Sequence, residues 1–182
     1  MDDAGEMGKL LEKEKKRFAG TELVGRTLGV VGLGAIGSII ANLALDLGMD
    51  VIGYDPAISV EAAWQLSSRV KRMDSLEQLL AAADYVTLHV PAIPETKHLI
   101  NSKSLGLMKK TAKILNFARE EIVSADDMLA ALNAGALAGY ISDFPAPNLL
   151  GRKDVLLMPH IGASTEEAEE NCAVMALSLI HI

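Results

Sequence analysis

The sequence predicts an α/β fold: a Rossmann-type, doubly wound parallel sheet in three layers. Three observations predict it. Strand-like apolar runs alternate with helical stretches along most of the chain. The chain is 50% hydrophobic but only 4% aromatic, a balance that suits a buried parallel sheet covered by helices. A glycine-rich turn, Gly32-Leu33-Gly34-Ala35-Ile36-Gly37, joins the first apolar run to the first long helical stretch.

The expected elements follow this alternation in order. Residues 6–19 indicate a helix, and Gly20 and Gly25 break the chain before the first strand. Apolar runs predict strands at 27–31, 51–54, 85–90, 112–116, 139–142 and 155–158. Helical stretches are expected at 35–47, 60–66, 75–82, 102–108, 125–134 and 165–178. Parallel strands need right-handed crossover connections, so we expect helices on both faces of the sheet.

The glycine turn has the residue types that a dinucleotide site requires. Gly32 allows the tight turn, Gly34 lets a pyrophosphate approach the backbone, and Gly37 lets the helix pack closely on the strand. A helix beginning near Ala35 would present free N–H groups to phosphate. Asp55 follows the second strand, roughly 20 residues after the turn, where its carboxylate would hold the adenosine ribose and repel a 2′-phosphate. NAD is therefore favoured over NADP, and the alternative is a glycine-rich connection in another α/β protein.

Composition and charge exclude several other classes of function. The chain has 17 basic and 24 acidic residues and a net charge of −7, which argues against nucleic acid as a partner. No uncharged apolar run reaches ~18 residues, so no membrane span is expected. Cys172 is the single cysteine, which excludes an internal disulfide and favours a cytoplasmic protein. No cluster of His, Cys and carboxylates has metal-ligand spacing, so no metal is expected.

Three chemically capable side chains follow expected strands. Arg119, Asp143 and His160 should meet at the carboxyl ends of a parallel sheet, near the glycine turn. An Arg can bind a carboxylate through two hydrogen bonds, a His can take or return a hydroxyl proton, and a nicotinamide can exchange a hydride. The set suggests oxidation of a 2-hydroxy acid or reduction of a 2-oxo acid. The alternatives are a surface His160, and an Arg119 that only pairs with Glu120 or Glu121.

The chain resembles the cofactor domain of the D-isomer-specific 2-hydroxyacid dehydrogenase family over roughly residues 8–176. The matching segments are Thr27–Gly37, Tyr54–Pro56, His89–Pro91 with Thr96, Asn116–Arg119, Ile122–Val123, Asp143–Pro145 and Pro159–Glu170. The last of these, within PHIGASTEEAEENCAVMA, is especially specific.

The resemblance implies a function for individual residues. Ala35 and Ile36 would offer backbone N–H groups to the pyrophosphate, and Asp55 would hold the ribose. The residues lining the adenine side would be Val90, Pro91 and Thr96. The residues flanking the nicotinamide would be Phe117, Ala118, Asp143, Gly162 and Ala163. Arg119 and His160 would be catalytic.

Two positions depart from the family pattern. Glu120 stands where the family has Gly after its catalytic Arg, which brings a negative charge beside a site for an anionic substrate. Asn148 stands where the family supplies a Glu that pairs with the catalytic His, and no Glu occurs between Ile122 and Thr165. An Asn can orient an imidazole but cannot stabilise an imidazolium by charge, so we expect weakened proton transfer.

The resemblance also implies how the chain is organised. We expect residues 1–20 to be the remnant of a preceding helical region, 21–176 the dinucleotide-binding domain, and 177–182 a non-native tail. The family's second domain, which closes over the substrate, is expected to be absent. The full-length form is expected to be a homodimer that acts on a small 2-hydroxy or 2-oxo acid. A catalytically inactive NAD-binding module is the alternative.

Overall fold

We describe the protein from a computed structural model, in which residues 3–15, 20–162, 164–168 and 170–171 are described. The expected site residue Ala163, the lone Cys172 and the tail 177–182 lie outside the described residues. The expected helix at 165–178 is described only in part, with helical backbone at 166–168 and 170–171.

The described residues form a seven-stranded, fully parallel sheet with the strand order β3-β2-β1-β4-β5-β6-β7. The strands are β1 (Thr27–Val31), β2 (Asp50–Tyr54), β3 (Lys71–Arg72), β4 (Tyr85–Leu88), β5 (Lys113–Asn116), β6 (Gly139–Ser142) and β7 (Val155–Leu157). The helices are α1 (Asp3–Lys15), α2 (Ala35–Asp46), α3 (Val60–Gln65), α4 (Leu76–Ala82), α5 (Ser102–Leu105) and α6 (Ala125–Asn133). Two 3-10 helices, η2 (Glu120–Ile122) and η3 (Pro147–Leu149), complete the described elements.

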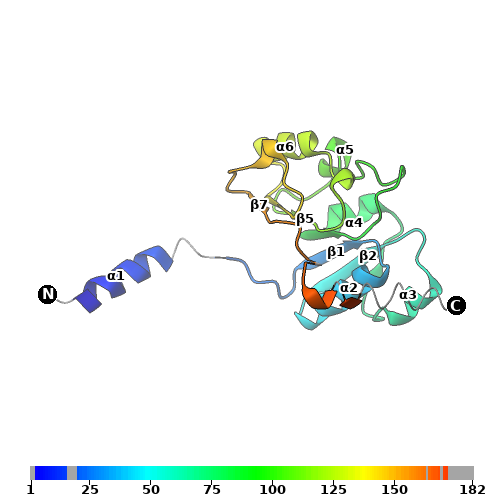
Figure 1. Ribbon diagram of the computed structural model, residues 1–182, viewed down its shortest axis with the longest axis horizontal. Helices are drawn as coiled ribbons and strands as arrows, with labels where there is room; N and C mark the ends of the chain where they lie inside the picture. Colours follow the sequence, from blue (N-terminus) through cyan, green and yellow to red (C-terminus); the bar gives the residue numbers. More distant parts are fainter. Residues whose placement is uncertain (1–2, 16–19, 163, 169, 172–182) are drawn as a thin grey trace.

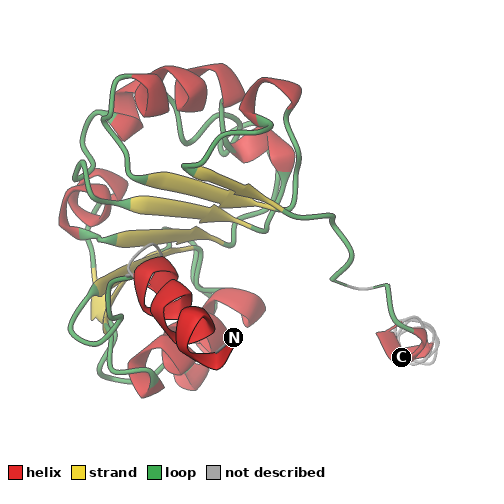
Figure 2. Ribbon diagram, turned by 90° about the vertical axis from the view of Figure 1, so that its left-hand side faces the viewer, coloured by secondary structure: helices red, strands yellow, loops and turns green. Residues whose placement is uncertain are grey.

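Helices cover both faces of the sheet, so the predicted three-layered Rossmann-type fold is confirmed (Figures 1 and 2). Figure 1 shows α2 and α3 on one side of the strands and α4, α5 and α6 on the other. All six predicted strands are present. Strand β3 was not predicted, because its two residues, Lys71 and Arg72, are exposed and carry no apolar pattern. The helix α1 lies apart from the sheet in Figure 1.

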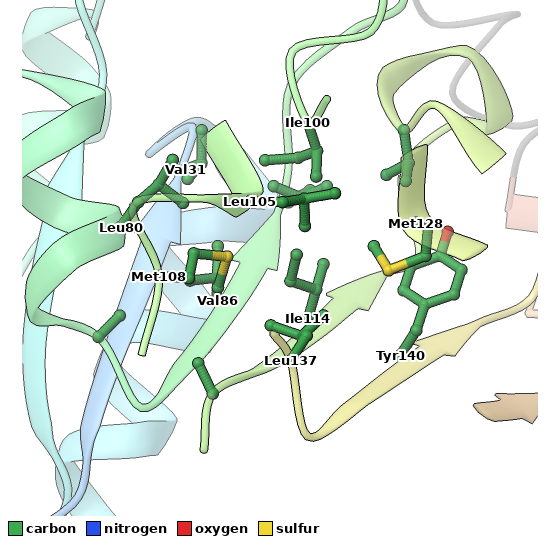
Figure 3. Packing of buried hydrophobic residues seen from close by; sticks show 14 of the residues in the cluster. Val31, Leu80, Val86, Ile100, Leu105, Met108, Ile114, Met128, Leu137 and Tyr140 are labelled. Carbon is green, nitrogen blue, oxygen red and sulfur yellow. The ribbon is translucent and has the colours of Figure 1, made fainter. Parts of the chain in front are cut away.

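Side-chain alternation along the strands divides the core into two clusters. On the α2 face, Leu28 and Val30 of β1 pack with Ala41 and Leu45 of α2. On the other face, the cluster joins β4, β5 and β6 to α4, α5 and α6, and includes Val86, Ile114, Met128 and Tyr140 (Figure 3). This larger cluster fixes β4 to β6, and the loops that carry Arg119 and Asp143 follow β5 and β6.

The described helices are too short or too polar to cross a membrane.

Candidate functional site

The carboxyl ends of the parallel strands form one side of the sheet, called here the carboxyl edge. The strands β1 and β4 are neighbours, with Val31 opposite Leu88, while their connections run to opposite faces. This reversal of strand order is the point where open α/β sheets bind ligands. The glycine turn follows β1, and the loop that begins at His89 follows β4, so the two face each other at this point.

The glycine turn has almost no room for larger residues at two of its three glycines. Gly32 has a φ of +89°, and a Cβ there would lie 2.6 Å from the backbone oxygen of His89. A Cβ on Gly37 would overlap the backbone oxygen of Gly32. Around Gly34, in contrast, a Cβ would meet no atom within 4 Å. The turn is therefore packed tightly against the protein on one side and open at Gly34 on the other.

The first turn of α2 begins without a capping side chain. Gly34 is its N-cap, whereas Ser59, Ser75 and Ser124 cap α3, α4 and α6 through their hydroxyl oxygens. A helix without a cap leaves backbone N–H groups available, and its N-terminus carries partial positive charge. Of the expected pyrophosphate ligands, Ala35 and Ile36 both lie in this turn and are exposed.

Asp55 connects the end of β2 to the glycine turn. Its Oδ2 accepts a hydrogen bond from the backbone N–H of Leu33 at 2.8 Å, and its Oδ1 accepts one from Ala57 at 2.8 Å. The sequence did not indicate this bracing of the turn. An ionised carboxylate has about four acceptor sites, so two such bonds leave it able to accept from a ribose hydroxyl as well.

A cavity of about 250 Å³ lies between α2 and the ends of β4 and β5. Six of the expected site residues line it, namely Ile36, Val90, Pro91, Phe117, Ala118 and Arg119, together with His89. Burial lowers the pKa of His89, whose Nε2 lies 2.9 Å from the hydroxyl oxygen of Thr87. His89 thus forms part of the cavity wall, and its burial favours the neutral ring.

Thr96 shapes the loop after β4 by hydrogen bonding to backbone. Its hydroxyl accepts from the N–H of Ile93 at 3.0 Å and donates to the backbone oxygen of Pro91. The cavity beside it does not include Thr96 among its lining residues. In this structure Thr96 therefore supports Pro91 rather than lining the cavity itself.

The loop that carries Arg119 is held by Asn116, the last residue of β5. Asn116 is fully buried, its Nδ2 donates to the backbone oxygen of Arg119 at 2.9 Å, and its Oδ1 accepts from Ala118 at 3.2 Å. The Asn116 amide also lies 3.4 Å from the hydroxyl of Tyr140, whose pKa is raised mainly by burial. Sequence reasoning noted Asn116 only as part of a segment, although a polar residue closing a buried strand is a signal that could have been used.

Arg119 is exposed, and its guanidinium donates to the backbone oxygen of Ala118 at 2.6 Å. Its neighbour Glu120 begins η2 and lines a different cavity, of about 320 Å³, together with Glu121 and Asp126. The ion pairs formed by the described residues do not include Arg119 with Glu120 or Glu121. Among the described residues, His98 is the only non-glycine residue with a positive φ, so the backbone at Glu120 is not strained in this way.

His160 pairs with Asp143. The Nδ1 of His160 lies 2.8 Å from Oδ2 of Asp143, and the ring of Phe144 lies 4.8 Å from the imidazole, inclined by 31°. The His160 side chain is 56% exposed and the Asp143 side chain 13% exposed. A mostly buried carboxylate therefore holds an imidazole that is open to solvent.

The structure corrects the expected pairing of Asn148 with His160. Asn148 lies in η3, and its Nδ2 donates to Oδ1 of Asp126 at 3.0 Å, in the first turn of α6. The buried Leu149 anchors η3 against α6, which directs Asn148 to that helix. Sequence spacing identified the loop but could not show which way its side chains point.

Gly162, expected beside the nicotinamide, is exposed, and a Cβ there would meet no atom within 4 Å.

The described part of the chain holds no group of three or more His, Cys, Asp and Glu that could bind a metal ion.

Comparison with known families identifies the kind of domain. The family model of the D-isomer specific 2-hydroxyacid dehydrogenase NAD binding domain matches residues 2–162. The chain belongs to this family. The D-3-phosphoglycerate dehydrogenase of Synechocystis sp. is 42% identical over 178 residues, which cover 94% of this chain but 32% of that protein. The chain therefore spans about a third of the length of this curated relative.

Two solved structures of the family have the same fold. The apo D-mandelate dehydrogenase of Rhodotorula graminis matches with a TM-score of 0.77 and 34% identity, over 89% of this chain and 48% of that one. The NAD-complexed D-isomer specific 2-hydroxyacid dehydrogenase of Lactobacillus delbrueckii ssp. bulgaricus matches with a TM-score of 0.75 and 30% identity, over 90% of this chain and 54% of that one.

Proposed function

We propose that this chain is the NAD-binding part of an oxidoreductase that acts on the CH–OH group of a D-2-hydroxy acid. One observation carries the proposal: Arg119 and the Asp143–His160 pair lie at the same carboxyl edge as the glycine turn. A domain that only binds a nucleotide has no need of an exposed Arg and a carboxylate-bound His at that edge.

The residues at the glycine turn fit NAD. The open space at Gly34 and the uncapped first turn of α2 suit a pyrophosphate. Asp55, at the end of β2, has acceptor capacity for ribose hydroxyls, and its charge would repel the 2′-phosphate of NADP. The cavity beside Val90, Phe117 and Ala118 provides apolar walls for a ring.

Arg119 and His160 would then act on the substrate. A bound nicotinamide would supply the hydride chemistry at the hydroxyl-bearing carbon. The guanidinium of Arg119 binds the carboxylate of the acid, and the imidazole of His160 takes the hydroxyl proton as the carbonyl forms. In the reverse direction His160 returns that proton to the carbonyl oxygen.

The substrate class rests on the curated relatives. The Synechocystis and Methanocaldococcus jannaschii proteins, each 42% identical over their matched regions, are D-3-phosphoglycerate dehydrogenases. We therefore propose conversion of 3-phosphoglycerate to 3-phosphohydroxypyruvate, in serine biosynthesis and in the cytoplasm, as the activity of the full-length form. The chain alone is proposed to be inactive.

We retain the homodimer as a proposal for the full-length form. An apolar groove of about 400 Å³ runs beside α2 over β4 and β5, and Leu43, Leu47 and Phe117 line it with partly exposed side chains. Apolar surface of this kind favours association with another protein surface.

An inactive NAD-binding module is the second candidate function. It is favoured by Glu120, whose negative charge stands next to Arg119 in the sequence, and by Asn148, which contacts Asp126 and carries no charge for His160. Both candidates require the same nucleotide site, so cofactor binding is the first property to measure.

Calorimetric titration of the purified chain with NADH, with NADPH alongside, tests the nucleotide site. We expect saturable binding of NADH, binding of NADPH at least about tenfold weaker, and loss of NADH binding in Asp55→Ala. Asp55→Asn keeps one acceptor oxygen and should weaken binding less. Asp46→Ala, at the far end of α2 and paired on the surface with Arg69, is the matched control and should bind NADH normally. A wild-type chain that folds but does not bind NADH would contradict the proposal.

A further inference from the structure

The carboxylate of Asp143 is only partly used by the protein around it. Its Oδ2 lies 2.8 Å from Nδ1 of His160, within hydrogen-bond distance. Its Oδ1 is buried and has no hydrogen-bond partner among the residues that the structure describes. Burying a carboxylate without compensation is costly, and such a group is usually held for a purpose. Among the described residues, the side chain that contacts this carboxylate is the imidazole of His160.

Backbone pairing brings Asp143 and His160 together. The strands β6 and β7 are in register, with Ser142 opposite Leu157, and the N–H of Met158 donates to the backbone oxygen of Ser142 at 2.9 Å. Asp143 directly follows β6, and His160 follows β7 by three residues. The ladder of the sheet therefore brings together the two strand ends from which Asp143 and His160 follow.

The ring of Phe144 restricts the imidazole from a second direction. Its centroid lies 4.8 Å from that of His160, in a tilted stack. The hydrogen bond to Asp143 fixes which nitrogen of the ring faces the protein, and the stack limits rotation of the ring plane. A carboxylate and an aromatic ring thus orient one exposed histidine.

We propose that Asp143 is the positioning residue of His160. The Oδ2 of Asp143 accepts the Nδ1–H of the ring, which leaves the Nε2 lone pair as the proton acceptor. The carboxylate also supplies the negative charge that compensates an imidazolium, a part that the uncharged Asn148 cannot play from η3, where it contacts Asp126 of α6. The absence of Glu between Ile122 and Thr165 therefore does not leave His160 without an anionic partner.

This inference rests on the proposed function for its chemical purpose, but the pairing itself can be tested without cofactor. Nitrogen-15 NMR distinguishes a protonated from an unprotonated ring nitrogen. The chain, labelled on histidine, is measured at a pH where the ring is neutral, and the signals of His160 are assigned by their loss in His160→Gln. We expect His160 to be in the Nδ1–H form, whereas a histidine free in water favours Nε2–H.

Three variants identify the partner. Asp143→Asn should lose the Nδ1–H form, because its amide can donate to Nδ1 and so stabilise the other tautomer. Asn148→Ala and the matched control Asp126→Asn should keep the wild-type signals. Circular dichroism establishes that each variant is folded.

The Nε2–H form in the wild-type chain, or an unchanged Nδ1–H form in a folded Asp143→Asn, would overturn the inference. The wild-type spectrum alone decides the matter should Asp143→Asn fail to fold. A chain that shows the expected tautomers but does not bind NADH would contradict the proposed function and leave the Asp143 pairing intact.

Discussion

The glycine turn after β1 and the histidine pair after β6 and β7 lie along the same edge of the sheet, but they are held in different ways. Backbone atoms packed in contact fix the turn, and Gly32 and Gly37 leave no space for a side chain. One hydrogen bond and one ring contact fix the histidine, which is more than half exposed. The first region resists a side chain at Gly32 or Gly37, whereas the orientation of the histidine depends on which partner is present.

This difference reflects what each region would have to do. A site for a pyrophosphate gains from N–H groups that are fixed before the ligand arrives, because ordering them on binding costs entropy. A group that exchanges a proton with a substrate needs access to solvent or substrate, so its side chain stays open and its orientation comes from one buried neighbour.

The largest expected effect is at Gly37. Gly37→Val should destabilise the fold by at least about 3 kcal/mol, because the new side chain overlaps the backbone oxygen of Gly32, which cannot move freely. Urea denaturation measures the change. Gly34→Ala is the matched control: it should cost no more than about 1 kcal/mol, yet weaken NADH binding, because its methyl group occupies the open side of the turn. Equal destabilisation by both variants would remove the distinction between the two sides of the turn.

A smaller effect concerns the pH dependence of stability. Burial lowers the pKa of His89, so the folded state favours the neutral ring. This contribution to stability is complete above the ordinary histidine pKa of 6.5 and is lost as the pH falls from there toward the lower folded value, because the unfolded chain binds the proton more readily. Between pH 7 and pH 5, urea denaturation should therefore show a smaller loss of stability for His89→Gln than for the wild type.

The control for His89 is His98→Asn, which replaces an exposed ring at a positive φ by a residue that tolerates this conformation. It should keep the wild-type dependence on pH. An identical pH dependence for His89→Gln and the wild type would show that the buried ring does not contribute in this range.

The smallest expected effect is at Asn148. Asn148→Ala removes one exposed hydrogen bond to Asp126 and should change stability by no more than about 0.5 kcal/mol. Thermal denaturation measures it. A large loss would mean that η3 contributes more to holding the edge near His160 than its surface contact suggests.

Most of the fold could be predicted because its signals are local. Each long strand is a continuous apolar run, and the helices between them begin at residues such as Ser75 and Ser124 that cap through their side chains. The strand β3 was not predicted because it consists of two exposed residues, Lys71 and Arg72, without an apolar pattern. These residues pair with β2 at the edge of the sheet. Its existence depends on β2 rather than on its own sequence.

Six of the expected site residues line the cavity beside α2, since parallel strands bring their ends together. The sequence did not predict the contacts that hold them. The partner of His160 could not be predicted in this way. Asp143 and Asn148 both lie in the segment between β6 and β7, and which of them contacts His160 depends on how η3 packs against α6.

The sequence by itself determined the parallel sheet, the glycine turn and the carboxyl edge, because strand periodicity and the steric demands of Gly32 and Gly37 are properties of short segments. Only the tertiary structure decided that Asp55 braces the turn and that Asp143 pairs with His160. Both contacts join residues that follow neighbouring strands, β1 and β2 in the first and β6 and β7 in the second. Their geometry exists only once the register of the sheet and the packing of its helices have been fixed.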